Sequence, residues 1–437
     1  MDETSPAEIQ EISAEADSPK TVTIDELQLL SQSELIRRFE TLGLKVNPER
    51  TRHQLVFDLL KGYAIRGVTI MAEGILDCAA DGQGVLRWPR FSFLNCPENV
   101  SVPTGLIKRF GLQSGNRLEV RARHPRDREK SLVVDEIIAI EGIPAASWTT
   151  PKNFEHLTPM FPTERIILEN PATKSLCARA VDLVAPLGHG QRALIVAPPR
   201  TGKTVMLKEI ANAIRANSPQ THLLLLLIDE RPEEVTDFRR SVDAEIFAST
   251  FDESPVRHVQ VAELVSHRAR RLVEAGKHVV ILLDSITRLA RGYNNLQPSK
   301  GRTMSGGVDA KALTKPKKFF SSARNVEEGG SLTIIATALV ETESRMDEVI
   351  FEEFKGTGNM ELHLDRSLVE KRVFPALNIL MSATRRDELL FHPQEFELVQ
   401  RMRKTLAQLP SMEATEVLLK NIRATQNNTE LLLAGIR

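Results

Sequence analysis

The chain has 437 residues, of which 41% are hydrophobic and 26% are charged. At roughly 150 residues per domain this length predicts about three domains, and the composition is too apolar for a disordered chain. The 57 lysine and arginine residues nearly balance the 58 acidic ones, so any contact with nucleic acid needs a local basic patch.

Residues 1–20 hold six carboxylates against one lysine, which predicts an acidic, disordered tail. The tail lacks a basic start followed by an apolar stretch, and no run in the chain has the ~20 apolar residues that cross a bilayer. The three cysteines, Cys78, Cys96 and Cys177, are odd in number and far apart, which argues against a disulfide framework and against a zinc site. We therefore expect a cytoplasmic protein without membrane contact.

Residues 21–66 predict a small helical module. Thr23–Leu27 can cap a helix whose apolar positions recur at helical spacing as far as Phe39. A second helix is expected from Thr51 to Ala64, after the turn Asn47-Pro48.

Residues 67–145 change to short apolar runs separated by glycine, proline and asparagine, which is typical of a small five-stranded barrel. The expected strands contain Gly74–Leu76, Gly84–Leu86, Val100–Val102, Leu118–Val120 and Leu132–Val134. Residues 108–130 hold eight lysines and arginines against three carboxylates, a local excess that can hold a phosphate backbone. The alternative is a solvated face whose charges bind nothing specific. Prolines between residues 146 and 180 then predict a linker.

Residues 181–437 alternate between strands and helices and end in helical spacing. The expected strands are nearly continuous apolar runs, at Ala193–Val196, His222–Ile228, Ile246–Thr250, His278–Leu283 and Leu332–Val340. Strands of this kind are buried on both faces, so we expect a parallel sheet covered by helices on each side.

A phosphate-binding loop follows the first of these strands. Ala197–Thr204 reads Ala-Pro-Pro-Arg-Thr-Gly-Lys-Thr and leads into a helix, so its amides can wrap nucleotide phosphates. Lys203 can neutralise the β- and γ-phosphates, and the Thr204 hydroxyl can bind Mg²⁺. The general pattern begins with glycine where this chain has Ala197; the alternative is a glycine turn that caps an ordinary helix.

Carboxylates follow two further strands at the edge of the sheet where such folds bind ligands. Asp284 ends the strand His278–Leu283 and can hold the magnesium shell. After His222–Ile228, Glu230 is our choice for the base that activates water, and Asp229 and Glu233 remain open. Capping of the next helix by this acidic group is the simpler alternative.

Four strings in this part of the chain resemble the Rho family of bacterial transcription termination factors, which are hexameric RNA-dependent ATPases and 5′-to-3′ helicases. The strings are Gly190–Arg192 with the loop Ala197–Thr204, and residues 226–235, 281–291 and 352–364. The family's own loop starts with alanine. The resemblance implies an OB-type barrel, a RecA-like ATPase domain with C-terminal helices, ATP and Mg²⁺ as cofactors, a homohexamer, and single-stranded RNA and the RNA polymerase elongation complex as partners.

The resemblance also implies roles for individual residues. Glu230 would activate water, Thr204 and Asp284 would serve the magnesium, and Arg385, with Arg372 nearby, would reach the γ-phosphate from a neighbouring subunit. Without the resemblance, either arginine is as readily a surface ion-pair partner. Nucleotide contacts fall on Gly188, His189, Gly190, Gln191, Arg192, Ala193, Arg200, Thr201, Gly202, Lys203, Thr204, Val205, Arg231 and Phe374.

For RNA, the resemblance implies two loops that line a central pore, Gln297–Gly307 with Arg302 and Thr342–Met346 with Arg345. A surface loop without a ligand is the alternative for each. In the barrel, Arg87, Glu129 and Lys130 stand at the family's RNA-binding positions.

The barrel departs from the family in its aromatic residues. Members stack bases on a Gly-Phe-Gly-Phe string and on two tyrosines, where this chain has Gln83, Val85, Ser101 and Ser131. Trp88, Phe91 and Phe93 are candidate substitutes; Phe91 and Phe93 are expected more often in the core, and Trp88 less so. Because stacking is worth ~1–3 kcal/mol per base, we expect weak RNA binding with little base preference.

Two other functions remain open at this point. One is a ring ATPase related to rotary ATP-synthase subunits or recombinases, which the basic barrel disfavours. The other is a non-catalytic RNA-binding protein or RNA chaperone, which Lys203, Glu230, Asp284 and Arg385 disfavour.

Overall fold

The computed structural model describes residues 19–47, 49–126, 129–298 and 305–436. The chain forms two compact units, an N-terminal unit of the residues up to Trp88 with Leu94–Thr149, and an ATPase unit of Pro89–Phe93 with the residues from Thr150 onward. The predicted acidic tail lies outside the described residues, except for its last two positions.

Three short helices open the N-terminal unit. After β1 (Thr21–Thr23), they are α1 (Ile24–Leu29), α2 (Gln32–Thr41) and α3 (Arg52–Ile65). The single helix expected as far as Phe39 is divided in two at Ser31. The Ser31 hydroxyl accepts a hydrogen bond from the Glu34 amide at 3.3 Å, and the Glu34 carboxylate accepts one from the Ser31 amide at 2.7 Å. This reciprocal capping box starts a new helix where the periodicity suggests a continuous one.

The barrel has the five strands that the sequence predicts. They are β2 (Thr69–Cys78), β3 (Gly84–Arg87), β4 (Val100–Val102), β5 (Arg117–Arg123) and β6 (Leu132–Ile140), with β7 (Ile143–Pro144) beside β6 and α4 (Thr104–Phe110) before β5. The order β2-β3-β4-β6-β5 closes through pairing of β5 with β2. Along β5, Leu118 and Val120 are fully buried, whereas Arg117, Glu119 and Arg121, which alternate with them, are exposed. This alternation is what a barrel with a filled interior requires.

The ATPase unit is built on a mostly parallel sheet in the order β13-β12-β14-β16-β11-β17-β18, with β15 and β8 at one end of β16. The strands are β8 (Pro159–Met160), β11 (Arg192–Ala197), β12 (His222–Glu230), β13 (Glu245–Thr250), β14 (His278–Asp284), β15 (Arg324–Val326), β16 (Ser331–Leu339), β17 (Met360–Leu364) and β18 (Leu377–Thr384), with β9 (Arg165–Ile166) and β10 (Leu187–Gly188) forming a separate pair. All five predicted strands are present. Every leucine of β12 is at most 2% exposed, which explains the absence of polar alternation in its sequence.

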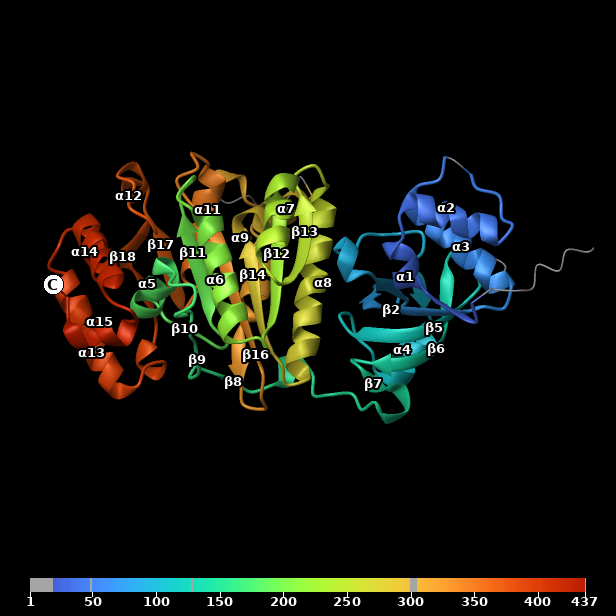
Figure 1. Ribbon diagram of the computed structural model, residues 1–437, viewed down its shortest axis with the longest axis horizontal. Helices are drawn as coiled ribbons and strands as arrows, with labels where there is room; N and C mark the ends of the chain where they lie inside the picture. Colours follow the sequence, from blue (N-terminus) through green and yellow to red (C-terminus); the bar gives the residue numbers. More distant parts are fainter. Residues whose placement is uncertain (1–18, 48, 127–128, 299–304, 437) are drawn as a thin grey trace, which may run out of the picture. The chain divides into compact units, whose positions relative to one another are not determined.

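Helices cover this sheet and extend beyond its β18 edge, where Figure 1 shows α13, α14 and α15 grouped together. The helices are α5 (Leu176–Val184), α6 (Lys203–Asn217), α7 (Pro232–Ser241), α8 (Pro255–Glu274), α9 (Ile286–Asn295), α10 (Thr314–Ser321), α11 (Arg345–Lys355), α12 (Arg366–Glu370), α13 (Pro393–Leu406), α14 (Ser411–Ala424) and α15 (Asn428–Ala434). Within the described residues, no helix is long and apolar enough to cross a membrane.

Candidate nucleotide site and RNA-binding surfaces

The predicted phosphate loop joins the end of β11 to the start of α6. Gly202 caps the helix with a φ of 89°, a left-handed conformation that favours glycine. The Thr201 hydroxyl donates a hydrogen bond of 2.7 Å to the Pro198 carbonyl and closes the loop. The amides of the first turn of α6, a helix of 15 residues, therefore form an anion site at Lys203 and Thr204.

Lys203 and Asp284 meet at the carboxyl edge of the sheet. The Lys203 ammonium lies 2.5 Å from Oδ1 of Asp284, which also accepts a hydrogen bond of 2.8 Å from the Thr337 hydroxyl. Oδ2 of Asp284 is buried and has no hydrogen-bond partner among the described residues. A buried carboxylate oxygen without a donor suits a bound cation, so this residue fits the predicted magnesium role.

Glu230 lies beside this pair and is 2% exposed. Its carboxylate accepts a hydrogen bond of 2.9 Å from the Arg288 guanidinium. Burial, and then the charge of Asp284, raise the pKa of Glu230 to about 7, against the opposing effect of Lys203 and Arg288. A carboxylate whose pKa is near neutrality is suited to accept a proton from water.

The two alternatives for the base are less enclosed. Asp229 is half-buried and Glu233 is exposed, so Glu230 alone of the three combines burial with contact to the charges of the site. Arg231, at the start of α7, is also exposed.

Sequence reasoning missed two residues of the site. Arg288 holds Glu230, and the Glu234 carboxylate lies 3.5 Å from the Thr204 hydroxyl. Both positions had a signal, because Glu234 is in the first turn of α7, the helix that follows β12, and Arg288 is in the first turn of α9 after Asp284.

A cavity of about 320 Å³ opens beside the phosphate loop. Thr201, Gly202 and Val205 line one side of it, and Phe374 lines another with 45% of its surface exposed. An apolar cavity next to a phosphate site, with an exposed ring, is suited to a nucleotide base. Stacking on Phe374 stays a prediction. Arg372, two residues earlier, is exposed on the same connection from α12.

The segment from Gly188 to Ala193 lies at the amino ends of the parallel strands, whereas the phosphate loop lies at their carboxyl ends. Asn359 binds the amide of Arg192 at 2.8 Å, and its carbonyl accepts a hydrogen bond of 2.8 Å from the Arg385 amide. Gly190 packs on the backbone of Asn325, where an added Cβ would lie 2.1 Å from the amide nitrogen. The part of β11 that follows Ala193 is about 13 Å long, and it separates this end of the sheet from the phosphate loop. Within one chain these residues and Arg385 therefore do not gather around the predicted nucleotide.

The barrel residues predicted to bind RNA are largely engaged with other side chains. Arg87 pairs with Asp77 at 3.2 Å, and Glu129 accepts two hydrogen bonds from Arg123 that lower its pKa to about 2. Lys130 is exposed.

The prediction that Trp88 offers a stacking surface is wrong. Its side chain is 1% exposed, and an added Cβ on Gly74 would lie 3.0 Å from its ring. Trp88 continues the inward alternation of β3 and fills the space left by that glycine. Phe93 is also fully buried, where it stacks on Phe247 with ring centres 4.8 Å apart.

Three arginines of the basic run, all on β5, are paired with carboxylates. Arg117 pairs with Glu73, and Arg121 pairs with Asp135 and Glu136, in addition to the Arg123 pair described above. The outward-facing arginines of β5 therefore present less positive charge than the sequence suggests. Exposed pairs of this kind open at little cost, typically below about 1 kcal/mol.

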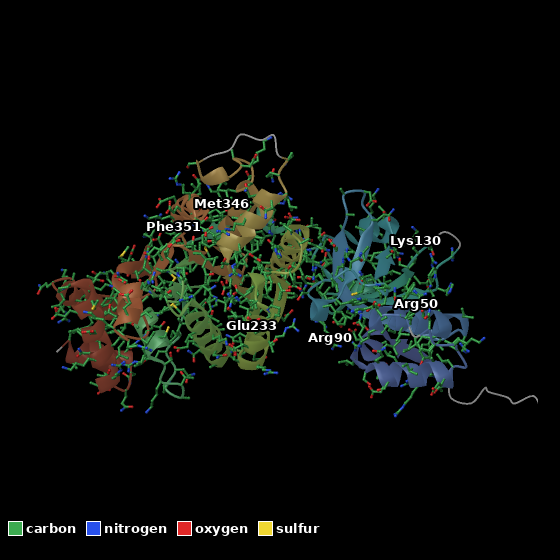
Figure 2. All side chains as sticks on the ribbon, turned by 90° about the horizontal axis from the view of Figure 1, so that it is seen from above. Arg50, Arg90, Lys130, Glu233, Met346 and Phe351 are labelled. Carbon is green, nitrogen blue, oxygen red and sulfur yellow. The ribbon has the colours of Figure 1, made fainter. Side chains whose placement is uncertain are left out.

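The described end of the first predicted pore loop, at Gly306, lies against the second predicted pore loop. An added Cβ on Gly306 would lie 2.7 Å from the Arg345 carbonyl oxygen. Figure 2 shows that Met346, at the start of α11, lies apart from Glu233, at the start of α7. Arg345 is exposed. Arg302 lies outside the described residues.

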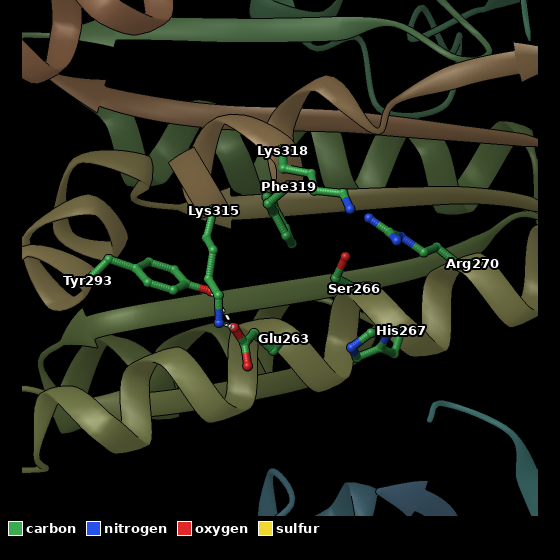
Figure 3. Close-up of a pocket in the computed structure, with 8 residues that line it drawn as sticks. All are labelled: Glu263, Ser266, His267, Arg270, Tyr293, Lys315, Lys318 and Phe319. Carbon is green, nitrogen blue, oxygen red and sulfur yellow. Dashed lines mark hydrogen bonds and ion pairs between the residues drawn. The ribbon is translucent and has the colours of Figure 1, made fainter. Parts of the chain in front are cut away.

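A separate cavity of about 300 Å³ lies among α8, α9 and α10 and does not include the phosphate loop. Figure 3 shows Lys318 and Arg270 directed toward one another there. The third cation, Lys315, is paired with Glu263 at 2.7 Å. The absence of a phosphate loop and of the carboxylates Glu230 and Asp284 argues against nucleotide hydrolysis at this cavity.

Comparison with known proteins finds a matching family for each of the two units. Residues 72–145 match the family described as Rho termination factor, RNA-binding domain, and residues 177–384 match the nucleotide-binding domain of the ATP synthase alpha/beta family. A transcription termination factor Rho from Akkermansia muciniphila is 52% identical over 95% of this chain and 88% of that protein. The Pseudomonas aeruginosa factor is 50% identical over 94% of this chain and 98% of its own length.

The chain belongs to the transcription termination factor Rho family. Membership makes it an RNA-binding ATPase of transcription termination, with the OB-type barrel and RecA-like domain that the sequence predicts. Solved structures show the same ATPase fold at low identity. A type III secretion system ATPase of pathogenic bacteria aligns with a TM-score of 0.52 at 23% identity, covering 63% of this chain and 80% of that one. An ATP synthase subunit from Nanoarcheaum equitans has a TM-score of 0.52 at 16% identity, over 67% of this chain and 76% of that chain.

Proposed function

We propose that this chain works as a homohexameric, Mg²⁺-dependent RNA translocase, with 5′-to-3′ helicase activity, that acts on the RNA polymerase elongation complex. The observation that carries the proposal is the placement of Arg385 at the sheet edge opposite Lys203, Glu230 and Asp284. A catalytic arginine on that edge serves a nucleotide only if the nucleotide belongs to another copy. Exposed Arg385 and the buried carboxylates then form one composite site between adjacent subunits.

The charges of the residues in this site indicate the role of each. Lys203 and the amides of the phosphate loop bind the phosphates, and Thr204 and Asp284 would hold a magnesium ion, which would supply positive charge against the phosphates. Glu230 accepts the proton of the attacking water, with Arg288 fixing its carboxylate at 2.9 Å. Arg385 of the next subunit, with Arg372 as the second candidate, stabilises the charge on the transferred phosphoryl group.

Helix α9 connects hydrolysis to RNA movement. It starts two residues after Asp284, and its Arg291 makes two hydrogen bonds to Asp347, at 2.8 and 2.7 Å. Asp347 belongs to the first turn of α11, two residues after Arg345 of the second predicted pore loop. A shift of α9 on loss of the γ-phosphate therefore reaches that loop through a charged contact, and positively charged loops can pull an RNA backbone.

The test mixes two inactive variants, Glu230→Gln and Arg385→Ala, and measures ATP hydrolysis with and without single-stranded RNA. Each variant alone should bind ATP and fail to turn over. Mixed rings should regain part of the RNA-stimulated activity, since some interfaces receive both intact residues. The control mixture, Glu230→Gln with the double variant, should stay inactive. No rescue in confirmed mixed hexamers would contradict a shared site, and RNA-independent turnover would favour a rotary-type ATPase.

A further inference from the structure

His53, Cys96 and Glu98 come together in the N-terminal unit, and none of them is a residue of the nucleotide site. His53 is in the first turn of α3, and Cys96 and Glu98 are in the connection between β3 and β4. One ligand atom from each side chain lies within 4.8 Å of the other two. The sequence separates the histidine widely from the other two residues, so only the fold brings the three side chains together.

The cluster is enclosed, and one carboxylate oxygen of Glu98 has no hydrogen-bond partner among the described residues. Cys96 is 5% exposed and Glu98 is fully buried. Oε1 of Glu98 accepts a hydrogen bond of 3.0 Å from the Gln28 amide and lies 2.7 Å from Nδ1 of His53. Oε2 of Glu98 and Oε1 of Gln28 are buried without a hydrogen-bond partner among the described residues. A buried carboxylate oxygen left without a donor is costly, and a cation supplies the missing positive charge.

We propose that His53, Cys96 and Glu98 bind one Zn²⁺ ion. Thiolate, imidazole and carboxylate are all zinc ligands, and the presence of sulfur and nitrogen selects zinc over Mg²⁺ or Ca²⁺. Zinc–ligand bonds of about 2.0–2.3 Å place tetrahedral ligands roughly 3–4 Å apart, which is compatible with the spacing of the three side chains. The fourth position falls to a water molecule, which can enter beside His53 because a quarter of its side chain is exposed.

Charge and protons balance in this site. The Cys96 thiol loses its proton when the metal binds, and His53 binds as the neutral imidazole with its proton on the other ring nitrogen, so one divalent ion meets one thiolate, one carboxylate and one neutral imidazole. The ion would join α3 to the barrel connection, in the same region where Gln28 of α1 already contacts Glu98. The inference is independent of the proposed ATPase mechanism, because none of its residues belongs to the nucleotide site.

The test uses the full chain, freed of metal by chelation and kept without nucleotide. Titration with Zn²⁺ should show one tightly bound ion per chain in the wild type. Cys78→Ser is the matched control, because Cys78 is a cysteine of the same unit outside the cluster, and it should bind zinc normally. Cys96→Ser and His53→Gln should lose this ion while keeping ATP hydrolysis, which reports that the chain is folded.

Co²⁺ gives a second readout that needs no variant. In the wild-type chain it should produce the sulfur-to-cobalt absorption band of a thiolate ligand, and added Zn²⁺ should abolish the band. Zn²⁺ should also raise the unfolding temperature of the wild type and not that of Cys96→Ser. Failure of the wild type to bind Zn²⁺, equal binding by Cys96→Ser, or a cobalt spectrum without a thiolate band would each overturn the proposal.

Discussion

The ammonium nitrogen of Lys203 lies 2.5 Å from Oδ1 of Asp284 at the carboxyl edge of the ATPase sheet. Asp284 is fully buried, and its second carboxylate oxygen has no partner among the described residues. In the proposed site a nucleotide phosphate would attract the lysine and a magnesium ion would attract the aspartate, so binding of both would replace this ion pair.

Asp284→Asn should therefore weaken the use of magnesium more than it weakens the binding of ATP. We expect a higher Mg²⁺ concentration for half-maximal hydrolysis and turnover reduced by about 10²-fold or more, as for loss of one electrostatic stabiliser. A magnesium titration of ATPase activity measures both. Asp237→Asn is the control, because Asp237 pairs with Lys208 at the exposed surface of α7. An unchanged magnesium requirement in Asp284→Asn would contradict the assignment.

The pKa of Glu230, raised to about 7, predicts the pH dependence of hydrolysis. A general base works only when deprotonated, so kcat/KM should rise with pH and level off above about 7. Glu230→Gln should lower the rate by about 10²–10⁴-fold, the usual contribution of general-base catalysis. It should also abolish the fall in rate at low pH, the acid limb of the profile. A pH–rate profile of the free enzyme measures the effect, and an acid limb that persists in Glu230→Gln would assign it to another group.

The raised pKa of Glu230 also predicts how the free energy of unfolding changes with pH. An unperturbed glutamate titrates near 4.5, so between about pH 4.5 and 7 the folded chain holds a proton that the unfolded chain has lost. Stability contributed by this group therefore falls as the pH rises through that window. Glu230→Gln removes this dependence, and its free energy of unfolding relative to the wild type should increase from pH 5 to pH 8. Denaturant unfolding at the two pH values, with Asp237→Asn as the control, tests this sign.

The contact between Arg291 and Asp347 should transmit hydrolysis to the predicted pore loop. Among the described residues, Arg291→Ala leaves the buried Asp347 carboxylate with the Thr342 hydroxyl as its side-chain donor, at 2.6 Å. Loss of hydrogen bonds to a charged group costs about 1–3 kcal/mol, so we expect slightly lower stability. Stimulation of hydrolysis by RNA should disappear while basal hydrolysis remains. Arg366→Ala, which breaks an exposed ion pair with Glu370 on α12, is the control. Full RNA stimulation in Arg291→Ala would contradict the coupling.

The sequence predicts best those features whose residues are contiguous in the chain. The phosphate loop, the continuous apolar strands and the carboxylates at their ends are contiguous in sequence, and each is found where it is expected. The periodicity that suggests one helix as far as Phe39 fails at Ser31, because a capping box competes with continued helix.

Features that depend on contacts between distant segments were not predictable. Hydrophobic character alone does not reveal that Trp88 fills the space beside Gly74, or that each arginine of β5 meets a carboxylate on a neighbouring strand or loop. The spacing of the cysteines argues against a cysteine-rich metal site, yet a mixed set of His53, Cys96 and Glu98 is formed by tertiary folding alone. The family resemblance implies that Arg385 serves a neighbouring subunit, and the strand pairing agrees, because Arg385 and the phosphate loop lie at opposite ends of the sheet strands within one chain.

The barrel should bind RNA weakly and with little base preference. Ser101 and Ser131, which stand where the family places stacking rings, instead form a hydrogen bond with each other at 2.7 Å. Gln83 is exposed and Val85 is half-buried, so neither offers an aromatic face. Binding then depends on phosphate contacts from exposed cations such as Lys130, and such contacts carry no base identity and weaken steeply with salt.

Fluorescence anisotropy of the full chain without nucleotide, with oligo-C and oligo-A at two salt concentrations, measures this prediction. We expect similar affinities for both oligomers and a marked loss at the higher salt. Replacing Gln83 and Val85 with phenylalanine should strengthen binding by ~1–3 kcal/mol per base engaged, because the two positions lie on or beside β3 and face away from the barrel core. Leucine at the same two positions is the control, since it adds apolar surface without a ring. Tight, salt-tolerant and cytidine-selective binding by the wild type would mean that other groups replace the missing rings, and equal gains from leucine and phenylalanine would show that stacking is not the cause.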